Sequence, residues 1–104
     1  MNRVYNKLVR DRIPEIIEGS GRTCTTEILS DDEYIRFLDA KLDEELSEYH
    51  QDHGIEELAD LLEVIQATAL AHGFSLEELE MIRAEKARKR GGFTKKILLK
   101  EVIE

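Results

Sequence analysis

Two long segments of the chain carry apolar side chains at the three- and four-residue spacing of an amphipathic helix, with only a short turn between them. The first begins after the capping residue Ser30 and ends near Asp52, where Gly54 follows as a stop signal, and the second runs from about Ile55 to Ala71. Because so short a connection makes neighbouring helices antiparallel, the pattern predicts a helical hairpin. The apolar positions are Ile35, Leu38, Leu42, Leu46, Tyr49, Leu58, Leu61, Leu62, Ile65 and Ala69.

Two further helices and a weaker strand signal complete the chain. Pro14 opens a short helix that reaches Glu18, and Ser75 begins a longer helix that stops at Gly91-Gly92, with Glu78 completing a capping box. Residues 22–29 are rich in threonine and predict a short strand, which residues 95–99 can join in a small two-stranded sheet. We therefore expect a mainly α single domain over residues 1–104, with the sheet as an optional addition.

Acidic and basic residues are separated along the chain. The net charge is −8, and thirteen of the twenty-three acidic residues lie in residues 31–63. Eight of the fifteen basic residues lie in residues 83–100 and four more in residues 3–12. The negative charge argues against binding to a nucleic-acid polymer. An acidic centre with basic ends suits a site for metal and polyphosphate, and it equally suits ordinary salt bridging on helix surfaces.

Two pairs of carboxylates flank the predicted turn. Glu45 and Glu48 are three residues apart, as are Glu57 and Asp60, so each pair lies on one helix face. Reflecting the sequence about the point between residues 52 and 53 superposes one pair on the other. Antiparallel helices would therefore hold all four carboxylates at matching heights, where they can converge on an ion.

Glu45 also falls on the apolar side of its helix, seven residues after Leu38. A buried carboxylate is costly unless it is paired or binds metal. Oxygen ligands with no nearby histidine or cysteine ligand set favour Mg²⁺, with Mn²⁺ as the alternative. The competing explanation is a solvated helix surface, because glutamate is a good helix former.

The carboxylates resemble the EExxE and ExxD motifs of MazG-type all-α nucleotide pyrophosphohydrolases. The matching residues are Glu44-Glu45-Leu46-Ser47-Glu48 and Glu57-Leu58-Ala59-Asp60. The chain is most similar to a small subgroup related to phosphoribosyl-ATP pyrophosphohydrolase. This likeness is carried by YNKLVRDRIPEII at residues 5–17, EELADLLEVI at 56–65 and EKARKRGGF at 85–93. Fewer residues separate Glu48 from Glu57 than in many MazG-type domains, which leaves the base specificity open.

The resemblance implies an enzyme that hydrolyses a nucleoside triphosphate, noncanonical ones included, to the monophosphate and pyrophosphate in a house-cleaning role. It implies a mostly helical homodimer or homotetramer in which Mg²⁺ is held by Glu45, Glu48, Glu57 and Asp60, with Glu44 as a weaker candidate. We expect Glu45 and Glu48 to serve catalysis, with Glu48 orienting the attacking water. Phosphoribosyl-ATP hydrolysis and a non-catalytic helical interaction module are the alternatives.

Basic residues near the end of the third long helix are candidate phosphate ligands. Lys86 and Arg90 are four residues apart and share a helix face, and Lys89 is the next candidate. The competing explanation is that cations are favourable at any helix C-terminus. A second basic group near the N-terminus either reaches the site or only bridges to the acidic helices: Lys7, Arg10 and Arg12.

The expected location is the cytoplasm, without membrane contact. The N-terminal residues lack the apolar region of a signal peptide, and no apolar run approaches the ~20 residues of a transmembrane helix. Cys24 is the single cysteine, so no internal disulfide is expected.

Overall fold

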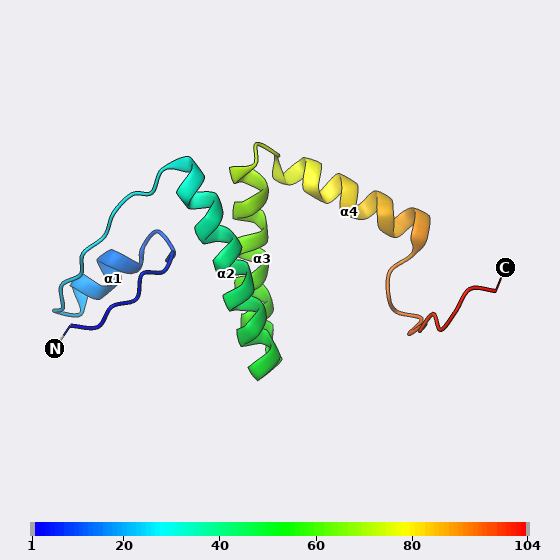
Figure 1. The fold of residues 1–104 in the computed structure, drawn as a ribbon, viewed down its shortest axis with the longest axis horizontal. Coiled ribbons are helices and arrows are strands. Elements are labelled where there is room, and N and C mark those ends of the chain that lie inside the picture. The colour runs from blue at the N-terminus through cyan, green and yellow to red at the C-terminus, as the bar shows by residue number, and fades with distance from the viewer. Residues whose placement is uncertain (1, 104) are drawn as a thin grey trace.

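The computed structural model describes residues 2–103, and Figure 1 shows their arrangement. The helices are α1 (Ile13–Gly19), α2 (Asp31–Asp52), α3 (Ile55–Ala71) and α4 (Leu76–Arg90). No strand occurs within residues 2–103. The mainly α fold and the predicted hairpin are confirmed.

The hairpin of α2 and α3 is the main packing unit of the molecule, and its two helices run antiparallel (Figure 1). His53 ends α2 in the left-handed conformation at φ +53°, and its N–H donates to the Tyr49 carbonyl at 2.7 Å. Gly54 then returns to extended backbone and begins α3. This two-residue turn places the carboxylate pairs close to the closed end of the hairpin.

Capping boxes fix where two of the helices begin. At the start of α4, the Glu78 N–H donates to Ser75 Oγ at 3.0 Å and the Ser75 N–H donates back to Glu78 Oε1 at 3.2 Å. This confirms the predicted box. A second box joins Ser30 and Glu33 at the start of α2. Each box satisfies amide donors that have no partner within the helix.

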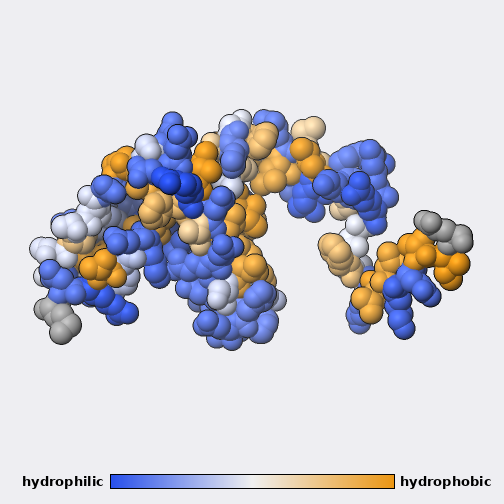
Figure 2. All heavy atoms as spheres, viewed as in Figure 1, coloured by the Kyte–Doolittle hydropathy of each residue, from blue (hydrophilic) through white to orange (hydrophobic). Residues whose placement is uncertain are grey.

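The apolar core of a single chain is very small. Leu38 is the one fully buried apolar side chain within residues 2–103, whereas Leu46 is 42% exposed and Leu62 is 53% exposed. One neighbouring helix can cover only one side of α3, which is apolar over much of its surface. Figure 2 shows this apolar surface along α3. The radius of gyration is 18.3 Å, against about 13 Å for a compact chain of this length.

The C-terminal third of the chain extends away from the hairpin (Figure 1). Helix α4 contacts α3 near their connection, and residues 91–103 continue beyond it without helix or strand. The tail leaves Phe93 98% exposed and Ile97 80% exposed. No helix within residues 2–103 combines the length and the apolar character needed to cross a membrane.

The optional sheet is absent from residues 2–103, because its two expected strands do not meet. Residues 22–29 lie on the α1 side of the hairpin and residues 95–99 lie beyond α4 (Figure 1). A strand needs a partner to satisfy its ladder of backbone hydrogen bonds. Both segments therefore remain irregular despite their sequence preference.

Candidate functional site

Glu45 is the one charged side chain that is buried within residues 2–103, with 6% exposed. Its Oε2 atom has no hydrogen-bond partner, and its Oε1 atom lies 3.5 Å from Lys41 Nζ. Burial raises the pKa of the Glu45 carboxyl, and the neighbouring Glu48 carboxylate raises this pKa further. Buried polar atoms without partners are uncommon in folded proteins. This oxygen therefore lacks the compensating contact that a buried carboxylate oxygen normally has.

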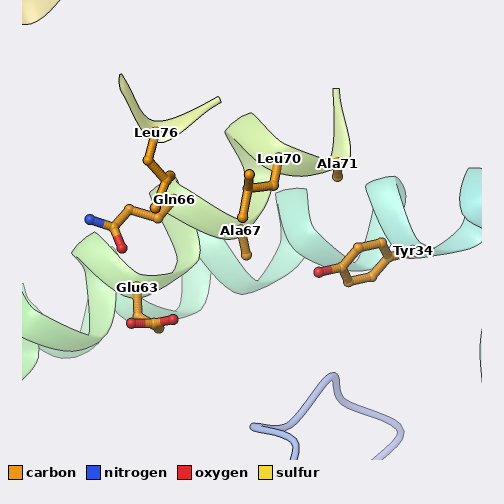
Figure 3. A pocket seen from close by; sticks show the side chains of 7 residues that line it. All are labelled: Tyr34, Glu63, Gln66, Ala67, Leu70, Ala71 and Leu76. Carbon is orange, nitrogen blue, oxygen red and sulfur yellow. The ribbon is translucent and has the colours of Figure 1, made fainter. Parts of the chain in front are cut away.

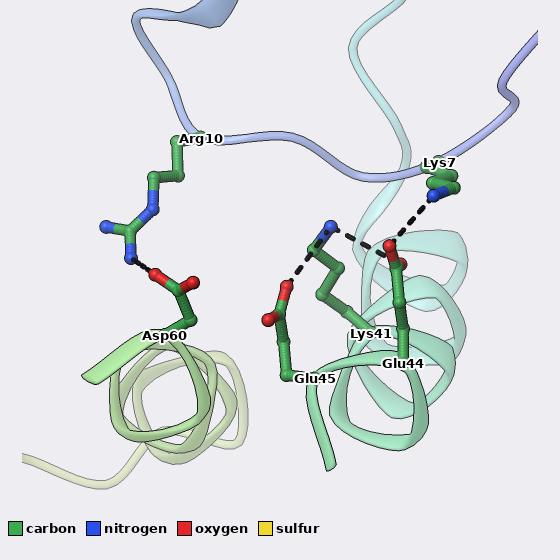
Figure 4. Close-up of polar contacts among 6 residues, drawn as sticks. All are labelled: Lys7, Arg10, Lys41, Glu44, Glu45 and Asp60. Atoms are coloured by element: carbon green, nitrogen blue, oxygen red, sulfur yellow. Dashed lines mark hydrogen bonds and ion pairs between the residues drawn. The ribbon is translucent and has the colours of Figure 1, made fainter. Parts of the chain in front are cut away.

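Asp60 on α3 acts on Glu45 across the hairpin. Its negative charge also raises the pKa of Glu45, whereas the Lys41 ammonium lowers it. Figure 4 shows the Glu45 and Asp60 side chains on the same side of the two helices, and no hydrogen bond or ion pair joins them. Removing the repulsion requires either a proton or a cation.

The N-terminal arm, residues 5–12, supplies cations to this carboxylate face. Lys7 Nζ lies 2.9 Å from Glu44 Oε1 on α2, and Arg10 Nη2 lies 2.7 Å from Asp60 Oδ1 on α3. Figure 4 shows the arm crossing above both helices, with the two side chains reaching down to the carboxylates. Lys7 and Arg10 of the N-terminal basic group thus reach the acidic helices, whereas Arg12 pairs with Glu15 on α1.

These ion pairs change the acidity of their members. The hydrogen bond from Lys7 holds the pKa of Glu44 below its usual value, and Lys41, at 3.3 Å from Glu44 Oε2, contributes in the same direction. Glu44 in turn raises the pKa of Lys7. Glu44 is therefore the carboxylate that the chain's own cations neutralise most fully, while Glu45 beside it keeps an unpaired oxygen.

The arm is also held by packing. Leu8 is half-buried and lines a small cavity of about 90 Å³ between the arm and α2, together with Phe37 and Ala40. Asn6 adopts φ +47°, a left-handed conformation that asparagine tolerates well, directly before Lys7. The arm thus meets α2 through an apolar side chain as well as through its ion pairs.

The other two predicted ligands are oriented differently. Glu48 is exposed on α2. Glu57 folds back over Gly54, so closely that a side chain at residue 54 would overlap the Glu57 carboxylate. This position favours the carboxylate because it lies at the positive end of α3. Within residues 2–103, no three aspartate, glutamate, histidine or cysteine side chains converge into a metal-binding group.

The chemistry of these donors fits a hard divalent cation. All are carboxylate oxygens, and Glu45 contributes one buried oxygen without a partner. Glu48, in the last turns of α2, and Glu57, in the first turn of α3, have long side chains that can change rotamer. Arg10 pairs with Asp60, and Lys7 pairs with Glu44, the weaker candidate ligand. Glu45, Glu48, Glu57 and Asp60 are the residues that would hold Mg²⁺.

The predicted phosphate ligands on α4 lie away from these carboxylates. Figure 1 shows α4 extending outward from the hairpin, so the structure does not bring Lys86, Lys89 or Arg90 to the acidic face within one chain. Lys89 Nζ instead lies 3.4 Å from Glu85 Oε1, one turn earlier on the same helix. Their phosphate-binding role stays a prediction.

A larger pocket, of about 320 Å³, opens where α2, α3 and the start of α4 meet (Figure 3). Tyr34, Leu70 and Leu76 form part of its lining, and the small side chains of Ala67 and Ala71 leave the space. Glu63, which also lines it, lies one turn beyond Asp60 on α3. The two alanines four residues apart are the sequence signal for this pocket, and the carboxylate motif does not predict it.

Comparisons with known proteins do not assign the chain to a family. No family model matches the chain, and no solved structure matches it. An uncharacterized protein of Mycolicibacterium smegmatis is 67% identical over 42 residues, which are 40% of this chain and 43% of that protein. The match therefore spans less than half of that relative.

Proposed function

We propose that this protein is a Mg²⁺-dependent nucleotide pyrophosphohydrolase, which converts a nucleoside triphosphate to the monophosphate and pyrophosphate. The observation that carries the proposal is the buried Glu45 carboxylate with an unpaired oxygen, beside Glu48 and across from Asp60. A solvated acidic surface has no reason to bury a carboxylate oxygen without a partner. The resemblance of the EExxE and ExxD segments to MazG-type enzymes supports the same reading.

The chain's carboxylates would divide the work. Bound Mg²⁺ would neutralise phosphate oxygens and so lower the barrier to attack by water. Glu48 is exposed and has no ion-pair partner within residues 2–103, which supports a role in accepting a proton from the attacking water. Water would add to one phosphorus of the α,β-phosphoanhydride, and the bond from that phosphorus to the bridging oxygen would break. The proton from water would pass to Glu48, and the monophosphate and pyrophosphate would be released. Glu45 and Asp60 would serve chiefly to hold the metal.

A panel of nucleotides tests this function. Pyrophosphate release is measured with normal and modified nucleoside triphosphates and with phosphoribosyl-ATP, each with Mg²⁺ and with chelator. Mg²⁺-dependent release from at least one triphosphate is the expected result. Release from phosphoribosyl-ATP alone would assign the alternative substrate, and no release from any compound would favour a non-catalytic helical module.

A homo-oligomer, most simply a dimer, is part of the proposal. One chain buries a single apolar side chain completely and leaves much of α3 exposed, which is too little for a stable core. A second copy packed on α3 would bury Leu58, Leu62 and Ile65, which are 44%, 53% and 39% exposed. The gain would be about 25 cal/mol per Å² of apolar surface.

A further inference from the structure

We propose that Lys7 and Arg10 of the N-terminal arm belong to the active site and bind the substrate's polyphosphate, exchanging their carboxylate partners for phosphate oxygens once a divalent cation is bound. This inference rests on the proposed function. It assigns a role to the arm that neither the carboxylate motif nor the basic end of α4 supplies.

The partners of the two cations carry the argument. Lys7 pairs with Glu44 on α2 and Arg10 pairs with Asp60 on α3, so the arm contacts the acidic motif of each helix. Arg12, two residues further along the chain, pairs instead with Glu15 on α1. Contact with the acidic motifs is therefore specific to Lys7 and Arg10 and is not a general property of the arm's positive charges.

The strength of these pairs makes exchange feasible. The side chains of Arg10 and Asp60 are 57% and 43% exposed, and Lys7 is 48% exposed. Exposed ion pairs contribute only ~0–1 kcal/mol, so a divalent cation that takes Asp60 as a ligand, or Glu44 as the weaker candidate, can displace the arm's cations. Leu8 faces Phe37 and Ala40 of α2 across a small cavity, so the arm also meets α2 through an apolar side chain that takes no part in the exchange.

The negative charge of a triphosphate gives a second argument that Lys7 and Arg10 bind the substrate. A nucleoside triphosphate approaching a carboxylate cluster is repelled unless cations accompany the metal. Helix α4 carries its basic residues away from the hairpin (Figure 1), whereas the arm holds Lys7 and Arg10 directly over the carboxylates (Figure 4). Arginine can bind two phosphate oxygens at once, and lysine acts as a point charge.

The double variant Lys7→Gln/Arg10→Gln tests the exchange by two binding measurements with opposite expected signs. Calorimetry with Mn²⁺ alone should show tighter binding, up to about fivefold, because the competing cations are gone. With Mn²⁺ saturating, binding of an uncleavable α,β-methylene nucleoside triphosphate should weaken by about tenfold or more. Arg12→Gln is the matched control, and it should change neither affinity.

Each other result is also decisive. Equal or weaker Mn²⁺ binding by the double variant, or unchanged binding of the analogue, would overturn the exchange while leaving the metal centre intact. Absence of Mn²⁺ binding by the wild-type protein would overturn the proposed function itself, and the exchange with it. If circular dichroism shows that the double variant is unfolded, Arg10→Lys replaces it. That variant keeps the charge, so Mn²⁺ affinity should hold while analogue affinity falls, and unchanged analogue affinity would refute the inference.

Discussion

The guanidinium of Arg10 lies 2.7 Å from the carboxylate of Asp60, although fifty residues separate them in the sequence. With the Lys7–Glu44 pair at 2.9 Å, this contact ties the N-terminal arm to both helices of the hairpin. The acidic face that would hold a metal is therefore neutralised in part by the chain's own cations. Glu45, between these pairs, is left with an unpaired oxygen.

Replacing Glu45 with Gln should stabilise the metal-free protein in a pH-dependent way. The folded-state pKa of Glu45 is raised above 4.5, so the folded state binds a proton more tightly than the unfolded state. The contribution of Glu45 to the free energy of unfolding is fully present below pH 4.5, where the carboxyl is protonated. It is lost as the pH rises through the raised pKa of the folded state. Groups acting on Glu45 are Glu48, Lys41 and Asp60.

Urea unfolding in chelator, from pH 4 to 8, measures this effect. The advantage of Glu45→Gln over wild type in the free energy of unfolding should grow with pH across that window. Glu44 has a lowered pKa and produces the opposite trend, but it is present in both proteins and cancels in the difference. If the difference in free energy of unfolding between Glu45→Gln and wild type does not change with pH, the charge of Glu45 does not destabilise the folded protein.

The two capping boxes should differ in their effect on stability. Ser30→Ala removes the cap of α2, which forms the hairpin, and should lower the free energy of unfolding by about 1 kcal/mol. Ser75→Ala removes an equivalent cap from α4, which makes few contacts, so it should fray that helix with a smaller effect on the hairpin. Urea unfolding followed by circular dichroism compares them, and a larger loss for Ser75→Ala would mean that α4 is integral to the core.

Light scattering should show a particle larger than the 12.0 kDa chain at micromolar concentration. The physical reason is the exposed apolar surface of α3. Leu62→Glu places a charge in that surface and should shift the protein toward the monomer, whereas Glu56→Gln on the same helix should not. A monomeric wild-type protein would contradict the proposed assembly.

The basic end of α4 gives a separate prediction. If Arg90 and Lys86 bind phosphate, Arg90→Ala should lower kcat, because a guanidinium fork strengthens as charge develops on the leaving pyrophosphate. Lys86→Ala should raise KM, and Arg90→Lys should reduce activity despite keeping the charge. Kinetics and thermal midpoints decide: full activity with a stability loss of ~1 kcal/mol or less would assign these cations to the helix end alone.

The helices could be predicted almost to the residue because their signals are local. Ser75 and Glu78 form the expected capping box, and the hairpin turns at His53 and Gly54 as the apolar pattern requires. The strand over residues 22–29 was wrong for a non-local reason. Strand preference is realised only beside a partner strand, and no residue pattern states whether two distant segments will meet.

The site shows the same division between local and long-range information. The helical spacing of Glu45 predicts its burial, and the mirrored positions of Glu45 and Asp60 predict that they share one side of the hairpin (Figure 4). The direction of the Glu57 side chain could not be predicted, because rotamer choice depends on the backbone of Gly54 nearby. The contact between Arg10 and Asp60 depends on how the irregular N-terminal arm crosses the hairpin, for which the sequence has no periodic signal.

The most direct test of the account is Mg²⁺-dependent pyrophosphate release by Asp60→Asn and Glu45→Gln. Both should lose turnover while keeping the helical circular dichroism of the wild type, because each substitution removes the charge of one metal ligand and keeps nearly the same side-chain shape. Asp43→Asn, which removes an exposed carboxylate of α2 beside the motif, is the matched control and should remain fully active. Wild-type turnover by either Asp60→Asn or Glu45→Gln would contradict a metal centre built from the paired carboxylates.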